Sequence, residues 1–91
     1  MEENRLDPYK TICYPVMTEV TSRLLESENK LVFVVNKNAT KRDIKTAVEQ
    51  LYDVVVDKVN STITAEGKKK AFVRLHQDYK AVDTAIKLGI L

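Results

Sequence analysis

The chain has 91 residues, 44% of them hydrophobic and 31% charged, with two glycines and two prolines, which indicates one ordered domain and not a disordered tail. No apolar run approaches the roughly 20 residues that span a bilayer and no signal-peptide pattern opens the chain, so we expect no direct membrane insertion. One cysteine, Cys13, and one histidine, His76, exclude an internal disulfide, leave a zinc site almost without ligands, and favour a reducing cytosolic setting.

The N-terminal third predicts an arm, a helix and a strand. Residues 1–14 show no hydrophobic periodicity, and we expect an irregular N-terminal arm there. A helix is predicted over about 18–27, with Thr18 as N-cap and Glu19 in its first turn. Its apolar stripe is expected to contain Val16, Val20 and Leu24. The run KLVFVVN then predicts a strand covered on both faces.

The stretch NATKRDIKTAVEQLYD predicts the next helix. Thr40 is its expected N-cap, and Asp43 follows three residues later as in a capping box. The stripe expected to face the core contains Ile44, Ala47, Val48 and Leu51. Lys41 and Arg42 lie in the first turn, where the helix dipole disfavours cations. That placement is compatible with phosphate binding; the alternative is an ordinary solvated helix end.

A hairpin and a last helix follow. In VVVDKVNSTIT, one strand face is expected to carry Val55, Val59 and Ile63, and the other Lys58, Asn60 and Thr62. A turn at Gly67 leads into KAFVRLH, the returning antiparallel strand. There, Ala71, Val73 and Leu75 alternate with Lys70, Phe72, Arg74 and His76. The last helix is expected to begin at an Asp78 cap, bury Tyr79, Val82 and Ile86, and end at Gly89.

These elements predict an α+β fold in a single domain over 1–91. We expect a small antiparallel sheet of about three to four strands with three helices packed on it. The charge is unevenly distributed along the chain. Residues 1–35 carry six acidic and four basic residues, whereas 36–52 carry four basic and two acidic, and 53–91 seven basic and five acidic. Two basic segments and an acidic first third indicate separate sides for a polyanion and for solvent or a partner; a mixed, solvated surface is the alternative.

The chain offers little for catalysis. It has no glycine-rich phosphate loop, and nothing marks Cys13 or a serine near His76 as an activated nucleophile. We therefore predict that the chain is not an enzyme and has no cofactor, no metal and no small-molecule substrate. RNA binding has more support, because Phe72 lies between Lys70 and Arg74, and lysines with an exposed aromatic ring suit phosphates and unpaired bases. The alternative is that Phe72 belongs to the core and the basic residues protect an edge strand.

A partial likeness to the RNA-recognition motif does not hold. VFVVN and KKKAFVRL resemble its two short signatures, but Lys69 replaces the glycine of the second signature, and Lys70 and Leu75 replace two of its aromatic residues. That motif also needs a fourth strand after its second helix, and only two residues follow Gly89. The chemistry of RNA binding is retained without this assignment.

Over nearly its whole length, from Tyr9 to Ile90, the chain resembles the universal large-subunit ribosomal protein L23 family. The likeness rests on YPVMTE, on GKKKAFVRL before a final helix, and on the central block. That block reads A-T-K-x-x-I-K-x-A-V-x-x-L-[FY]-x-V-x-V-x-x-V-N, which spans a helix and a strand. The short turn TAEGKKKA and the ending AIKLGI are similar to the archaeal and eukaryotic branch.

The resemblance implies a structural rRNA-binding protein in the cytoplasmic ribosome, at the mouth of the exit tunnel, with neighbouring ribosomal proteins as partners. The implied rRNA contacts are Lys37, Lys41, Arg42, Lys45, Lys58, Asn60, Thr62, Lys68, Lys69, Lys70, Phe72 and Arg74. It also implies that Glu19 and Asp53 belong to a surface for the signal recognition particle and the translocation channel; the alternative for each is helix capping and solvation. The family commonly has lysine after its T-E pair; here Val20 stands there and is expected to pack inward or against a neighbour. The alternative functions are a free-standing single-stranded RNA-binding module and a protein-only adaptor.

Overall fold

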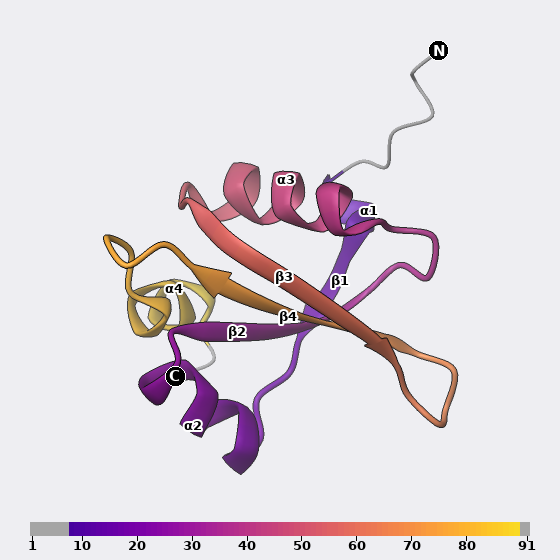
Figure 1. The fold of residues 1–91 in the computed structure, drawn as a ribbon, viewed down its shortest axis with the longest axis horizontal. Coiled ribbons are helices and arrows are strands. Elements are labelled where there is room, and N and C mark those ends of the chain that lie inside the picture. The colour runs from indigo at the N-terminus through magenta and orange to yellow at the C-terminus, as the bar shows by residue number, and fades with distance from the viewer. Residues whose placement is uncertain (1–7, 90–91) are drawn as a thin grey trace.

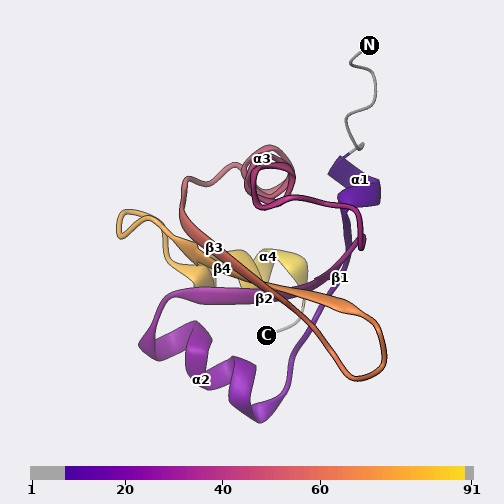
Figure 2. The same ribbon diagram turned by 45° about the vertical axis from the view of Figure 1, so that its right-hand side comes forward.

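The computed structural model describes residues 8–89. In chain order the elements are α1 (Pro8–Thr11), β1 (Ile12–Pro15), α2 (Glu19–Ser27), β2 (Lys30–Val35), α3 (Lys41–Tyr52), β3 (Val56–Ile63), β4 (Lys69–Leu75) and α4 (Ala81–Leu88). The strands form one antiparallel sheet in the order β1-β2-β4-β3. In the views of Figures 1 and 2, α3 lies above β2 and α2 lies below it, and α4 lies behind the strands. The predicted α+β class is confirmed, with the short α1 as an additional helix.

Two capping boxes begin the main helices. The Thr40 hydroxyl accepts a hydrogen bond from the Asp43 N–H (3.1 Å), and the Asp43 carboxylate accepts one from the Thr40 N–H (3.0 Å), as predicted. At α2 the same exchange takes place between Thr18 and Thr21. Each box satisfies backbone donors that a helix start leaves without a partner. The sequence signals for both helix starts are therefore confirmed.

The core lies on one face of the sheet. It joins the alternating side chains of β2 and β4 to buried residues of α2, α3 and α4: Leu31, Phe33, Val35, Ala71, Val73, Leu75, Leu25, Ile44, Ala47, Val48, Ala81 and Ala85. Phe33 is fully buried, and its ring stacks on Tyr52 of α3 at a centroid distance of 5.8 Å. The predicted burial of Ile44, Ala47 and Val48 is confirmed. All of β2 except its first residue is buried on both faces, as the run KLVFVV predicts.

The predicted stripe of α2 is wrong. Val20 is 65% exposed, and the residues of α2 that are buried are Thr21 and Leu25. A polar residue can take the inward position because the Thr21 hydroxyl is bonded within the capping box, to the Thr18 N–H at 2.6 Å. Val16 precedes the helix and donates its N–H to the Val32 carbonyl at 2.8 Å, so it extends β1 instead of joining α2.

The expectation of an irregular arm is also wrong for residues 8–14; residues 1–7 lie outside the described part. Thr11 ends α1 and is 1% exposed, and β1 follows and pairs with the free edge of β2. The register shifts between Ile12 and Tyr14, which leaves Cys13 as an irregularity. A four-residue strand interrupted by a bulge shows no alternation, so sequence periodicity could not reveal it.

A second bulge changes which valines of β3 face the core. Val56 pairs with Leu75 and Lys58 with Arg74, so Asp57 is the extra residue. Val56 is consequently buried with Val59, whereas Val55 is 42% and Ile63 59% exposed. Val59 and Ile63 share the core side of the sheet as predicted, since they pair with Val73 and Lys69, although Ile63 is exposed at the end of the strand. Val55 lies on the other side, because the bulge inverts the alternation before it.

The last helix begins later than predicted and buries a different face. It starts at Ala81, buries Ala81, Thr84 and Ala85, and leaves Tyr79 36% and Ile86 57% exposed; Val82 alone of the predicted stripe packs partly against the core. Its cap comes from a distant residue, because the Asn29 side-chain carbonyl accepts a hydrogen bond from the Ala81 N–H at 2.7 Å. Asp78 does not provide that cap. The predicted end at Gly89 is confirmed, with a left-handed φ of 76°.

Candidate nucleic-acid interface

The sheet face opposite the core carries rows of paired residues. We name this surface the basic face and define it by the side chains across β2, β4 and β3: Lys30, Arg74 and Lys58 in the first row, Val32, Phe72 and Asn60 in the second, and Val34, Lys70 and Thr62 in the third. Pairing in register puts each row on one face because paired residues of antiparallel strands point the same way. Six of the predicted contact residues thus lie together here.

Phe72 lies at the middle of the basic face. It is half-buried, between Val32 and Asn60 in its row, and it does not belong to the core cluster. Arg74, Lys58, Asn60 and Thr62 around it are exposed, and Lys70 is half-buried. The alternative in which Phe72 fills the core is therefore wrong; whether its ring meets a base stays a prediction.

The two basic segments of the sequence meet at one end of the molecule. We name this surface the basic end and define it as Lys37, Lys41, Arg42, Lys45 and Lys68. The Lys69 ammonium donates a hydrogen bond to the Ala39 carbonyl at 2.6 Å, which ties the hairpin to the loop before α3. A Cβ added to Gly67 in the turn would lie 3.8 Å from the Lys37 Nζ. Both observations place the hairpin turn beside the loop that leads into α3.

The three consecutive lysines have three different environments. Lys69 is on the core side of β4 and half-buried, and its ammonium is engaged by Ala39. Lys68 is exposed and donates to the Tyr14 hydroxyl at 3.3 Å. That hydrogen bond, with the charges of Tyr14 and Glu66, raises the pKa of Lys68, so it stays cationic. Lys70 belongs to the basic face. The strand alternation therefore separates neighbours that the sequence shows as one cluster.

The two predicted docking acids lie on different helices. Glu19 begins α2 and forms an exposed ion pair with Arg23 at 3.2 Å. Asp53 ends α3 as its C-cap in a left-handed conformation, with φ 56°. It lines a hollow of about 370 Å³ with Asp78, Lys80, Asp83 and Lys87. Because α2 and α3 lie on opposite sides of β2 in Figure 1, the fold does not bring these two carboxylates together.

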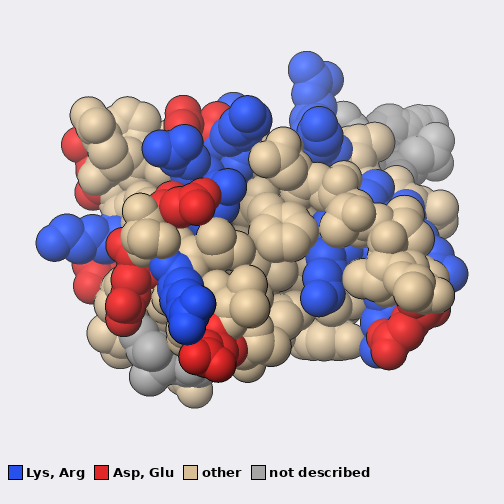
Figure 3. All heavy atoms as spheres, turned by 60° about the horizontal axis from the view of Figure 1, so that its bottom comes forward, with Lys and Arg blue, Asp and Glu red and all other residues tan. Residues whose placement is uncertain are grey.

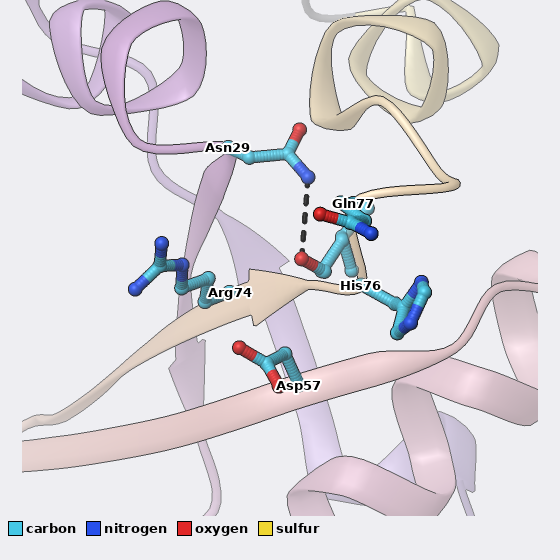
Figure 4. A pocket seen from close by; sticks show the side chains of 6 residues that line it. Asn29, Asp57, Arg74, His76 and Gln77 are labelled. Carbon is cyan, nitrogen blue, oxygen red and sulfur yellow. Dashed lines mark hydrogen bonds between the residues drawn. The ribbon is translucent and has the colours of Figure 1, made fainter.

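A polar hollow of about 330 Å³ lies beside the first row of the basic face (Figure 4). Its side chains are those of Asn29, Asp57, Arg74, His76 and Gln77. Asn29 donates from its side-chain amide to the Leu75 carbonyl at 3.2 Å, and the His76 Nδ1 accepts from the Asp78 N–H at 3.1 Å. The sequence reasoning missed this group, because Asn29 reaches it from the turn before β2 and Asp57 from a bulge.

Lys30 is a further cation that the sequence reasoning left out. It opens β2 in the row of Arg74 and Lys58, and its ammonium lies 3.0 Å from Glu28. Lys30 could be recognised as part of this surface only from the register in which β2 pairs with β4. In Figure 3, lysines and arginines surround a central uncharged area, and most acidic side chains gather in the left half of the view. The hairpin turn and the start of α3 lie toward the opposite, right-hand end in Figure 1.

Comparison with known proteins decides the family. The model of the family described as ribosomal protein L23 matches residues 10–87. The chain belongs to the ribosomal protein L23 family. It is also 47% identical over 85 residues to the large ribosomal subunit protein uL23 of Methanococcus aeolicus (strain ATCC BAA-1280 / DSM 17508 / OCM 812 / Nankai-3), which covers 93% of this chain and 99% of that protein.

Membership of the ribosomal protein L23 family confirms the resemblance read from the sequence. It makes the chain a structural protein of the large subunit in the cytoplasmic ribosome, and it confirms the prediction that the chain is not an enzyme. Along the described residues, every helix is too short or too polar to cross a membrane. Residues 8–89 also contain no group of three or more side chains suited to a metal ion.

Proposed function

We propose that the chain binds large-subunit rRNA through the basic end and the basic face, close to the exit of the polypeptide tunnel. The meeting of the hairpin turn with the loop before α3 is the observation that carries this proposal, because it merges two basic segments that lie about 30 residues apart in sequence into one cationic surface. Clustered lysines and arginines bind phosphates and release counterions, a term that supplies much of the affinity for nucleic acids.

The basic face adds a different kind of contact to this proposal. Arg74, Lys58 and Lys70 supply charge around the half-buried Phe72 ring. Arginine planes and aromatic rings stack on unpaired bases, which is the usual way in which proteins read RNA outside double helices. The basic end therefore holds the backbone, and the basic face meets bases.

Binding to large-subunit rRNA tests the proposal. The exposed pair Lys41→Ala and Arg42→Ala should reduce the salt dependence of binding by roughly 1.4–1.8 in the log–log slope, for two phosphate contacts. The control pair Lys80→Ala and Lys87→Ala removes the same charge from the surface near Asp53 and should leave the slope unchanged. Equal slopes for both pairs would refute a localised rRNA surface.

Co-sedimentation separates the remaining functions. Tagged protein should sediment with the large subunit at moderate salt. A free-standing RNA-binding module would instead bind short single-stranded oligonucleotides without the ribosome, and a protein-only adaptor would ignore polyanions. Either result would overturn the proposed function.

The second part of the proposal concerns docking. Glu19 and Asp53 offer exposed carboxylates on separate helices, and we infer that they contact factors at the tunnel exit, the signal recognition particle and the translocation channel. Glu19→Gln and Asp53→Asn remove charge and keep size, and Asn tolerates the left-handed conformation of Asp53. Each substitution should weaken factor binding to ribosomes and leave rRNA binding unchanged; unchanged factor binding would exclude that residue from docking.

A further inference from the structure

A hollow beside Tyr14 has no role in the fold or in the contacts described so far. It has a volume of about 450 Å³ and lies between the end of β1 and the hairpin turn. Its lining includes Tyr14, Val16, Val34, Glu66, Lys68 and Lys70. Val34 and Lys70 are paired in the third row of the basic face, so the hollow opens on the same surface as Phe72. Its volume falls within the range of small-ligand sites.

The floor of the hollow is apolar. Val34 is 8% exposed, and Tyr14 pairs with it across β1 and β2, while Val16 is held in line by its N–H bond to Val32. Tyr14 itself is 46% exposed. A half-exposed aromatic ring beside the buried Val34 and the partly buried Val16 provides an apolar surface that a flat ring can cover.

Two lysines supply charge at the border of that surface. The Lys68 ammonium lies 6.0 Å from the centre of the Tyr14 ring and 3.3 Å from its hydroxyl. Lys70 flanks the hollow from β4, and Glu66 is the acidic residue in the lining. An ammonium has three donors, so Lys68 can keep Tyr14 and still bind an anion. The group therefore fits a ligand with a flat ring and an attached negative charge.

We propose that this hollow takes one unpaired nucleotide of the large-subunit rRNA. The base lies against the Tyr14 ring and the Val16–Val34 floor, and its phosphate lies between Lys68 and Lys70. This inference rests on the proposed rRNA binding and adds a base-stacking residue that is not among the predicted contacts. An aromatic protein side chain in the hollow would leave Lys68 and Lys70 without an anion, and a carboxylate side chain would leave the apolar floor uncovered, so a nucleotide, which has both a ring and a phosphate, is the better match.

Three variants test the proposal with a full-length large-subunit rRNA transcript as the probe. Tyr14→Ala should weaken binding by about 5- to 150-fold, because stacking contributes about 1–3 kcal/mol per base and 1.4 kcal/mol corresponds to tenfold. Tyr14→Phe keeps the ring and loses only the hydroxyl that Lys68 contacts, so it should bind within about threefold of the unmodified chain. Tyr79→Ala is the control and should bind normally, because the Tyr79 ring is 36% exposed and lines a separate hollow with Asp53. The salt slope of Tyr14→Ala should not change, because no charge is removed.

A cross-linking experiment needs no variant and guards against misfolding of Tyr14→Ala. Irradiation of the complex with a 4-thiouridine-substituted transcript should yield a nucleotide adduct on the peptide that contains Tyr14. If the unmodified chain binds the transcript but Tyr14→Ala binds equally well and no adduct forms, the hollow is not a nucleotide site and the proposed function stands. If the unmodified chain does not bind the transcript, both proposals fail.

Discussion

Lys69 and Lys70 are neighbours in sequence, and the structure predicts opposite results when each is replaced by alanine. Lys69 points to the core side and donates to the Ala39 carbonyl at 2.6 Å. Lys70 lies on the basic face, paired through its backbone with Val34 and Thr62, and its ammonium makes no hydrogen bond or ion pair to the described residues. Lys69→Ala should therefore reduce stability, and Lys70→Ala should reduce RNA binding.

The magnitudes follow from these two environments. Lys69→Ala removes a charged hydrogen bond and leaves the carbonyl of Ala39, a residue that is 1% exposed, without this partner. Because Lys69 is half-buried, solvent reduces the usual value, and we expect a loss of about 1 kcal/mol in the free energy of unfolding. For a domain of this size that corresponds to roughly 4–8 °C in Tm. Lys70→Ala should change stability by less than about 0.5 kcal/mol.

The binding assay should show the reverse order. Lys70→Ala should lower the salt slope of rRNA binding by roughly 0.7–0.9, the contribution of one phosphate contact, and Lys69→Ala should leave it unchanged. Urea denaturation gives the stability, and filter binding at several salt concentrations gives the slope. Lys69→Met keeps the aliphatic stem and isolates the lost hydrogen bond. If Lys69→Ala lowers the slope as Lys70→Ala does and costs no stability, the assignment of Lys69 to a structural role is wrong.

Three further predictions concern the fold. Phe33→Ala, at a fully buried ring stacked on Tyr52, should lower the free energy of unfolding by about 3–5 kcal/mol in urea denaturation, and a loss below 1 kcal/mol would contradict the core assignment. Thr40→Ala should cost about 1 kcal/mol by thermal denaturation, because α3 loses its capping box, whereas Thr62→Ala on the exposed strand face should cost much less. Burial raises the pKa of Tyr52 above its ordinary value of 10.0, so the folded state favours the neutral phenol. The stability that Tyr52 contributes is therefore complete below pH 10.0 and is lost as the pH rises beyond that value. Urea titrations should show that Tyr52→Phe loses less stability than the unmodified chain above pH 10.0; equal losses would show that Tyr52 titrates alike in both states.

Local sequence signals were sufficient to predict α3, β2 and β4. Thr40 and Asp43 form the predicted capping box, β2 is buried as a continuous apolar run, and β4 alternates as KAFVRL indicates. The family was also evident from the central block, and the family comparison confirms it. These features depend on residues within one turn or one strand of each other, and propensity and periodicity report such short-range interactions directly.

Only the tertiary structure decided which faces are buried and which cations share a surface. Two bulges, at Cys13 and Asp57, shift the side chains of β1 and β3, and a bulge depends on the partner strand. The cap of α4 comes from Asn29, 52 residues before Ala81. Lys69 donates a hydrogen bond to the loop before α3, whereas the strand register places Lys30 in one row with Arg74 and Lys58. Each of these outcomes depends on contacts between distant segments, which no short stretch of sequence contains.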